Sequence, residues 1–187
     1  MNFIDTELDG VFIVEPTLFG DNRGYFTETY RADLFNAHAG CHIDFVQDNE
    51  SRSSMGVLRG LHYQRGQHSQ AKLVRCTAGT IIDVAVDLRR SSPSFMKHIA
   101  VCLSADNHRQ LFVPRGFAHG FVVLSDIAVF QYKVDNRYCP SAEVSLRYDD
   151  PALGIEWPTD GLNLNLSAKD LSAKNLAELD AAGLLFD

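Results

Sequence analysis

The sequence lacks the features that would direct a chain to a membrane, to nucleic acid or to an oxidising compartment. Basic residues are in the minority, with 17 Lys and Arg against 24 Asp and Glu. The formal charge of −7 argues against nucleic acid or an anionic membrane as the main partner. No apolar run approaches the roughly 18 residues that span a bilayer, and the N-terminus has no basic-then-apolar signal pattern. We therefore expect a cytoplasmic protein.

Cysteine is also sparse. The four residues, Cys41, Cys76, Cys102 and Cys139, are scattered, with no CxxC pair and no spacing typical of a zinc site. Nothing else in the chain suggests secretion. We therefore expect free thiols that pack as small hydrophobic residues.

What is present is the composition of an ordinary globular chain. Of its 187 residues 45% are hydrophobic and 22% charged, so we expect one domain over 1–187 that folds without disulfides or a structural metal. Short segments rich in Val, Ile, Phe and Tyr predict strands over 11–15, 25–29, 43–47, 72–76, 81–88, 98–103, 110–113, 121–124 and 128–134. Residues 78–80 are typical of a hairpin turn, and helical pattern is limited to 31–38 and 168–185. Many short strands with tight turns predict an antiparallel sandwich or barrel.

Acids and bases are unevenly distributed. No Asp or Glu occurs over 51–82, a stretch that holds Arg52, Arg59, His62, Arg65, His68, Lys72 and Arg75. This pattern is typical of a local anion site, or of bases that balance acids brought in from other segments of the fold.

Period-two alternation indicates which polar side chains point inward. Lys72 and Tyr132 fall on the apolar faces of their strands, and His119 has the parity of the apolar residues that follow it. His62 is a candidate for the same space. A buried lysine is costly unless it is paired or used. Each residue could be a satisfied core group, but the four together predict a barrel interior that holds a ligand.

Two segments resemble the two halves of the cupin motif, GVLRGLHYQ over 56–64 and PRGFAHG over 114–120. Many cupins bind a metal through an H-x-H pair, a glutamate and a histidine of the second motif. Here Gln64 replaces the second histidine of the pair, and no glutamate follows before Glu143. Only His62 and His119 remain as ligands, so we expect no metal.

A narrower resemblance covers nearly the whole chain. The segments FGDNRGYFTE, FVQDNESRS, VLRGLHYQ, KLVRC, VPRGFAHGF, QYKVDNRY, GIEWP and LSAKD follow in this order between residues 19 and 170. Together they resemble the dTDP-4-dehydrorhamnose 3,5-epimerases, which act without a cofactor on a dTDP-linked 4-keto-6-deoxy sugar. The resemblance implies a mainly β, cupin-type jelly roll with a few short, mostly C-terminal helices, and a homodimer.

The same resemblance implies catalytic roles at the matching positions. His62 would be the general base and Asp170 its orienting partner. Tyr132 would be the general acid, and Lys72 would stabilise charge on the sugar oxygen. A 4-keto sugar has acidified protons on C3 and C5, so inversion needs a base, an acid on the other face and a donor to the enolate oxygen. A carboxylate on the imidazole fixes its tautomer.

The resemblance also implies a set of substrate contacts. Besides Lys72 these are Arg23, Glu28, Gln47, Asp48, Asn49, Arg59, His119, Tyr138, Glu143 and Lys169. Tyr138 would stack on the thymine ring, as an amphipathic aromatic side chain can. Arg23 and Arg59 suit the diphosphate because a guanidinium donates to its oxygens in pairs.

The residues alone leave alternatives open. Ser167 and Asp170 have the spacing of a helix cap, Tyr132 could be one more interior aromatic, and Tyr138 could be a turn residue. The chain could also be a single-centre epimerase or a ketoisomerase acting on a related nucleotide sugar. A non-catalytic sugar-binding cupin would be expected to lack the base or the acid, whereas His62 and Tyr132 are both present.

Overall fold

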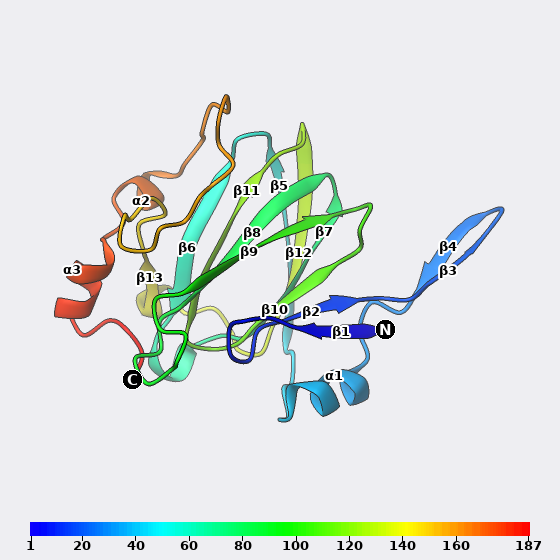
Figure 1. The fold of residues 1–187 in the computed structure, drawn as a ribbon, viewed down its shortest axis with the longest axis horizontal. Helices are drawn as coiled ribbons and strands as arrows, with labels where there is room; N and C mark the ends of the chain where they lie inside the picture. The colour runs from blue at the N-terminus through cyan, green and yellow to red at the C-terminus, as the bar shows by residue number, and fades with distance from the viewer.

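Two antiparallel β-sheets packed face to face make up most of the molecule (Figure 1), whose computed structural model describes residues 1–187. The larger sheet has the strand order β1-β2-β10-β7-β12-β5, with bounds Asn2–Asp5, Phe12–Glu15, Gln110–Val113, Lys72–Ala78, Ile127–Val134 and Gln47–Ser54. The smaller sheet has the order β13-β6-β11-β8-β9, with bounds Glu143–Ser145, Leu58–Gln64, Phe117–Val123, Thr80–Asp87 and His98–Ser104. A ligand between the sheets would therefore meet side chains from both.

The remaining elements lie outside this sandwich. A separate hairpin of β3 (Leu18–Asp21) and β4 (Gly24–Thr27) projects away from the body (Figure 1). The helices are α1 (Ala32–Ala39), α2 (Ala168–Leu171) and α3 (Leu176–Ala181), and single 3₁₀ turns occur at Gly66–His68 and Pro140–Ala142. None of the helices has the length and apolar character that crossing a membrane requires.

The core has three parts, one between the two sheets and one on the outer face of each sheet. The central cluster lies between the sheets and includes Val74 of β7, Phe121 of β11 and Phe130 of β12. The outer face of the larger sheet is covered by α1, which buries Phe35 against apolar residues of β2, β7 and β10. The outer face of the smaller sheet is covered by α3 and the C-terminal segment, including Leu179. With both outer faces covered, the free space is left between the sheets.

The expected mainly β, cupin-type fold is confirmed, and eight of the nine predicted strand segments lie mainly within a strand of the structure; β6, which carries His62, is not among the predicted segments. The predicted hairpin at 78–80 is wrong. β7 and β8 pair with different neighbours and belong to different sheets, and Gly79, with φ of 78°, turns the corner between them. A Cβ at Gly79 would lie 2.0 Å from the carbonyl oxygen of Ile127, so this corner requires glycine.

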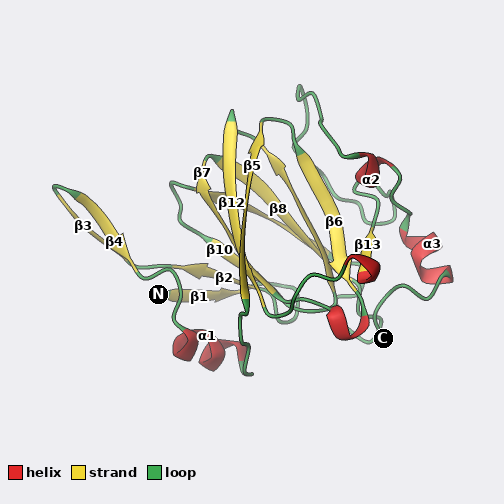
Figure 2. Ribbon diagram, turned by 180° about the vertical axis from the view of Figure 1, so that it is seen from behind, coloured by secondary structure: helices red, strands yellow, loops and turns green.

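Two other predictions also need correction. Residues 43–46 are not a strand, and Ile43 and Phe45 are apolar because they pack against the cluster under α1. The strand of this region is β5, which is polar on both faces and forms the edge of the larger sheet (Figure 2). The predicted helix over 168–185 is divided into α2 and α3, because Lys174 forms an isolated bridge with Leu146 between them.

Candidate active site

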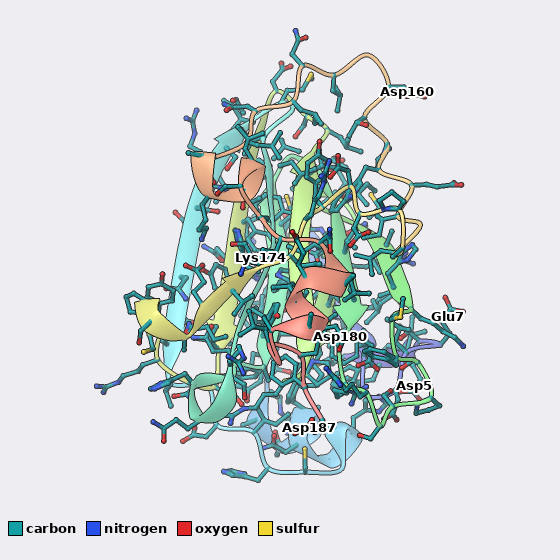
Figure 3. All side chains as sticks on the ribbon, turned by 90° about the vertical axis from the view of Figure 1, so that its left-hand side faces the viewer. Asp5, Glu7, Asp160, Lys174, Asp180 and Asp187 are labelled. Carbon is teal, nitrogen blue, oxygen red and sulfur yellow. The ribbon has the colours of Figure 1, made fainter.

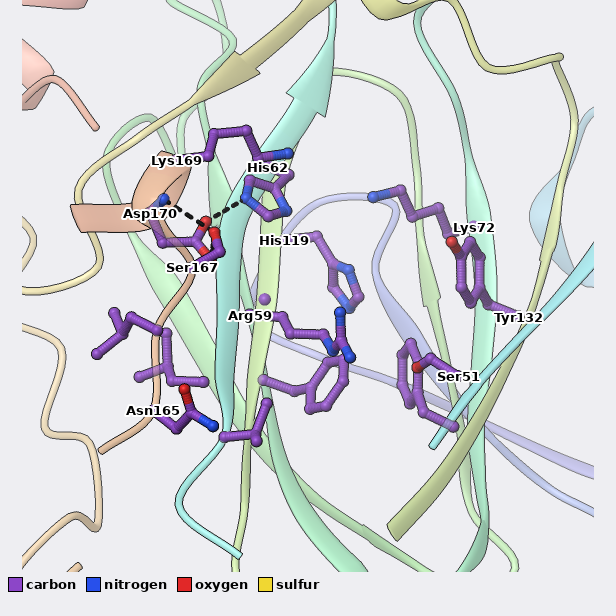
Figure 4. A pocket seen from close by; sticks show the side chains of 16 residues that line it. Ser51, Arg59, His62, Lys72, His119, Tyr132, Asn165, Ser167, Lys169 and Asp170 are labelled. Carbon is purple, nitrogen blue, oxygen red and sulfur yellow. Dashed lines mark hydrogen bonds and ion pairs between the residues drawn. The ribbon is translucent and has the colours of Figure 1, made fainter. Parts of the chain in front are cut away.

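A cavity of about 650 Å³ lies between the sheets and is bounded on one side by residues 165–170 (Figure 4). Its ionisable lining residues are Arg59, His62, Lys72, His119, Tyr132, Lys169 and Asp170. Three of these are Lys or Arg and only one is a carboxylic acid, whereas acids such as Asp160 and Asp180 lie on the outer surface (Figure 3). Part of this basic lining comes from the acid-free stretch 51–82, which favours its interpretation as a local anion site.

His62 on β6 is held by Asp170 on α2. Nε2 of His62 donates to Oδ1 of Asp170 at 2.5 Å, and only 3% of the aspartate side chain is exposed. Ser167 is the N-cap of α2: its Oγ accepts from the backbone N–H of Asp170 and donates to Oδ2 at 2.7 Å. Asp170 therefore takes part in the helix cap through its backbone and holds the His62 ring through its side chain. Nδ1 of His62 is left without a protein partner and faces the cavity (Figure 4).

The charge state of Asp170 follows from its partners. Burial would raise the pKa of this carboxyl, but the hydrogen bonds from His62 and Ser167 outweigh it, and the pKa lies below its ordinary value. An ionised Asp170 accepts from Nε2 of His62, which keeps the proton on that nitrogen. Nδ1 of the neutral ring is then the lone-pair nitrogen.

Main-chain hydrogen bonds attach the segment that carries Asp170 to the start of β6. The N–H of Asn165 donates to the carbonyl of Gly56 at 2.9 Å, and the N–H of Leu58 donates to the carbonyl of Asn165 at 3.1 Å. Gly56 has φ of 78°, and a Cβ there would lie 2.3 Å from the carbonyl oxygen of Asn163. Glycine permits this close approach, so backbone pairing places α2 against β6.

A second histidine–carboxylate pair lies beside the first. Nε2 of His119 is 2.9 and 3.0 Å from the two carboxylate oxygens of Asp83 on β8, and both side chains are buried. Sequence reasoning missed Asp83. The signal was available, since an aspartate inside the apolar strand TIIDVAVD is costly to bury without a partner.

Lys72 on β7 and Tyr132 on β12 stand on the opposite wall, in the larger sheet (Figure 4). Neither Nζ of Lys72 nor the hydroxyl of Tyr132 has a hydrogen-bond partner in the protein, although both lie against the cavity. Burial lowers the pKa of Lys72 to about 8, although the carboxylates of Asp83 and Glu143 act in the opposite direction. Burial raises the pKa of Tyr132, so this phenol keeps its proton at neutral pH.

Three of the expected substrate contacts form one group that includes Lys169 of the cavity lining. Glu143 on β13 accepts from Nζ of Lys169 at 2.7 Å and from the hydroxyl of Tyr138 at 2.8 Å. Burial would raise the pKa of Glu143, but these two donors outweigh it and hold the pKa below its ordinary value. The ring of Tyr138 is 52% exposed, so one of its faces is open to a planar ligand.

The expected substrate contacts on β5 point to opposite faces of the strand. Asn49 is the register partner of Tyr132 and shares its face, and Nε2 of Gln47 donates to Oδ1 of Asn49 at 2.7 Å. Asp48 points to the other face, where it pairs with Lys133 at 2.8 Å. Alternation along the strand therefore keeps the side chain of Asp48 away from the cavity.

Arg59 and Arg23 have very different positions. Arg59 lines the cavity, where its Nε donates to Oγ of Ser53 at 3.2 Å. Arg23 lies at the projecting hairpin, 85% exposed and paired only with its neighbour Asp21. Glu28 follows the hairpin and is also exposed. Within this chain, Arg23 and Glu28 do not line the cavity.

The donor set does not fit the metal site of many cupins. Nε2 of both His62 and His119 is engaged by a carboxylate, and Oε1 of Gln64 accepts from the backbone N–H of Cys139 at 2.8 Å. No group of three or more His, Cys, Asp and Glu side chains is arranged to hold a metal ion. The chemistry of the site must therefore be derived from its acids and bases.

A cupin-type sandwich with ionisable side chains on both walls of its cavity is the framework of an enzyme that moves protons. The chain belongs to the dTDP-4-dehydrorhamnose 3,5-epimerase family, whose model matches residues 5–178, and is accordingly an isomerase. The resemblance seen in the sequence is thereby confirmed. The dTDP-4-dehydrorhamnose 3,5-epimerase of Escherichia coli is 53% identical over 180 residues, which is 96% of each chain.

Solved structures agree with this assignment. A dTDP-6-deoxy-D-glucose-3,5-epimerase from Legionella pneumophila in complex with dTDP-4-keto-L-rhamnose matches with a TM-score of 0.93 at 49% identity, covering 99% of this chain and 97% of that one. A 3′-monoepimerase from Streptomyces bikiniensis in complex with dTDP-quinovose has a TM-score of 0.92 at 34% identity, covering 97% and 91%. Epimerases that invert one sugar carbon and epimerases that invert two therefore share this fold.

Proposed function

We propose that the cavity between the sheets is the active site in which dTDP-4-dehydro-6-deoxy-D-glucose is inverted at C3 and C5 to give dTDP-4-dehydro-L-rhamnose. One observation carries the proposal. His62, tied to an ionised carboxylate, faces the cavity from one sheet, while Lys72 and Tyr132 face it from the other sheet without any protein partner. The dTDP-sugar ligands of the related solved structures support the class of substrate.

The reaction needs only proton transfers. Nδ1 of His62 removes the proton from a carbon next to the C4 ketone, and the electron pair moves onto the ketone oxygen to form an enolate. The ammonium of Lys72 stabilises that oxygen, and His119, which also lines the cavity, is a second group to contact the sugar. Tyr132 then returns a proton to the carbon from the opposite face. A positioned acid or base contributes about 10²–10⁴-fold, and an oxyanion donor about 10²–10³-fold.

The nucleotide end of the substrate would lie at the cavity mouth. We assign the thymine ring to the open face of Tyr138, which Glu143 holds together with Lys169. The diphosphate would lie near Lys169 and Arg59, whose charges attract it and whose donors match its oxygens. Gln47 and Asn49 follow Tyr132 along the same face of the larger sheet and complete the set on that wall.

Arg23 and Glu28 require a second copy of the chain. We propose a homodimer in which the hairpin of one protomer reaches the cavity of its partner. The hairpin supports this because it projects from the body and exposes Phe19, Tyr25 and Phe26 at 59%, 60% and 67%. Aromatic side chains gathered on a projecting segment are typical of a surface that is covered in an assembly.

The setting of the enzyme follows from the same features. We propose that residues 1–187 act as one catalytic unit, because residues of both sheets and of α2 line a single cavity. We place it in the cytoplasm, because all four cysteines are unpaired, which is typical of proteins in reducing compartments.

The test is to incubate the protein with dTDP-4-dehydro-6-deoxy-D-glucose in heavy water, with a chelator present throughout. Deuterium at both C3 and C5 of an L-lyxo product supports the double epimerase without a metal. Deuterium at one carbon, however long the incubation, would make it a single-centre epimerase. Binding of the sugar nucleotide with no exchange at all would make it a binding module and overturn the proposal.

A further inference from the structure

We propose that Ser167 is a positioning residue of this active site, whose hydroxyl holds the Asp170 carboxylate in the orientation that presents His62 to the sugar. This inference rests on the proposed function, because it assigns work to a residue that acts only through the base. It goes beyond that function because Ser167 is neither the acid nor the base of the proposed reaction.

The first observation is that one hydroxyl makes two different bonds. Oγ of Ser167 accepts from the backbone N–H of Asp170 at 3.2 Å, and its proton goes to Oδ2 of the same residue at 2.7 Å. The backbone of Asp170 and its side chain are therefore both tied to a single oxygen atom. With the other carboxylate oxygen 2.5 Å from Nε2 of His62, neither oxygen of the carboxylate is free to rotate away.

The second observation separates this arrangement from an ordinary helix cap. A cap requires only that the side-chain oxygen accept a backbone N–H. The proton of the hydroxyl has no part in capping, and here it is directed at the buried carboxylate. Besides His62 and Ser167, no side chain or backbone N–H donates to the carboxylate of Asp170. Removing the hydroxyl would leave Oδ2 buried and without a partner.

The nearest cap in the chain provides a contrast. Asn175, the N-cap of α3, also accepts from the backbone N–H three residues on, at 2.9 Å, and belongs to a full capping box with Glu178. Glu178 is exposed and reaches back to the backbone N–H of Asn175. The two caps share the same local geometry, but only the one at Ser167 connects to an imidazole in the cavity.

The connection has a chemical consequence. A hydrogen bond to a carboxylate stabilises its ionised form and draws charge away from it. Without that bond Asp170 would hold the imidazolium form of His62 more strongly, and the base would become available only at higher pH. The serine is therefore expected to set both the orientation and the working pH of the base.

The test compares Ser167→Gly, Ser167→Ala and Ser167→Thr with Asn175→Ala. Glycine is tolerated at an N-cap at a small cost in stability, so Ser167→Gly removes the donor and keeps the fold. We expect kcat to fall about 10- to 100-fold, as for other groups that orient a functional imidazole, with KM little changed. The acidic limb of kcat/KM should move to higher pH. Ser167→Thr should restore both, and Asn175→Ala should lower Tm while leaving kcat and the limb as in wild type.

Two outcomes are distinguishable from a failure of the proposed function, which would appear as an inactive wild-type protein. If wild type epimerises and Ser167→Gly does so within twofold of its kcat with an unmoved acidic limb, Ser167 is only a cap and the inference is overturned. If Asn175→Ala loses activity as Ser167→Gly does, the effect reports helix stability, and the inference also fails.

Discussion

His62 and His119 are direct register partners across β6 and β11, and each presents its Nε2 to a different carboxylate. The two neighbouring rings nevertheless have different access to the cavity. The side chain of His62 is 23% exposed, whereas that of His119 is 6% exposed. A base must reach a proton on a sugar carbon, so the more accessible ring is the better candidate for the base. His119, whose Nε2 is bound to Asp83, is better suited to contacting the substrate from a fixed position.

The first prediction follows from that assignment. His62→Ala should lower kcat by about 10²–10⁴-fold, the loss typical of a general base, while substrate affinity measured by calorimetry is retained. His42→Ala is the matched control, since this histidine is exposed and is not among the residues that line the cavity. A fully active His62→Ala enzyme would contradict the assignment.

Asp170→Asn separates the two roles that the structure unites at this residue. The cap of α2 uses the backbone N–H of Asp170, so if Asp170 only caps the helix the substitution should change the free energy of unfolding by about 1 kcal/mol or less. An amide can hold the wrong imidazole tautomer, so if Asp170 orients His62 kcat should fall strongly. Thermal unfolding and turnover, measured on the same preparation, distinguish the structural role of Asp170 from its role in catalysis. Unchanged turnover would leave Asp170 with a structural role alone.

The depressed pKa of Lys72 predicts the alkaline side of the pH profile. Below about pH 8 the ammonium is present and stabilises the enolate, and above it the amine is neutral, so kcat/KM should decline there. In Lys72→Arg the side chain stays charged at this pH, so the decline should disappear even though activity is lower. An alkaline limb at the same pH in both proteins would assign it to another group.

The same shift affects stability with a definite sign. A lysine in the unfolded chain keeps its proton up to about pH 10.4. Between about pH 8 and that value the unfolded state binds more protons than the folded one, so stability should rise with pH through this window. The increment should be absent in Lys72→Met, as urea unfolding at a series of pH values would reveal.

Tyr132→Phe should separate exchange from inversion. His62 remains in this variant, so solvent deuterium should still enter at the enolised carbon. Return of a proton from the opposite face should be impaired, because the phenol hydroxyl is absent. NMR of the product in heavy water should therefore find deuterium in sugar of unchanged configuration. Inversion at the wild-type rate would exclude Tyr132 as the acid.

The proposed dimer predicts complementation between two inactive proteins. A mixed dimer of Arg23→Ala and His62→Ala has one cavity that combines His62 of one protomer with Arg23 of the other. Random pairing makes about half of the dimers mixed, so the mixture should recover about a quarter of wild-type activity. A mixture of His62→Ala and Tyr132→Phe should recover nothing, because both residues come from the same chain. No recovery in the first mixture would place Arg23 outside the partner's site.

Patterning predicted most of the strands that contribute apolar residues to the core, but it missed β6, which carries His62, and the polar strand β5. The alternation around Lys72 and Tyr132 placed both side chains in the cavity, because one face of each strand packs in the core. β5 carries no such signal, since one of its faces meets the polar cavity side and the other meets solvent. The apolar Ile43 and Phe45 just before it belong to a loop that covers α1.

Local sequence also could not reveal which segments meet in space. Nothing near Asp83 indicates His119, and the pair is formed only because β8 and β11 are neighbours in the smaller sheet. The turn at Gly79 has hairpin chemistry, yet the strands on either side enter different sheets. For Arg23 and Glu28 the resemblance named residues that one chain does not bring to the cavity.

The partner of the base lies far along the chain from the base itself. His62 and Asp170 are 108 residues apart in sequence, and every other cavity-lining residue outside the segment 165–170 precedes that segment. During synthesis on the ribosome, both sheets are complete in sequence before the carboxylate that orients the base is added. The segment 165–170 also forms one side of the cavity, so a growing chain gains this wall at the same time as the carboxylate that holds His62.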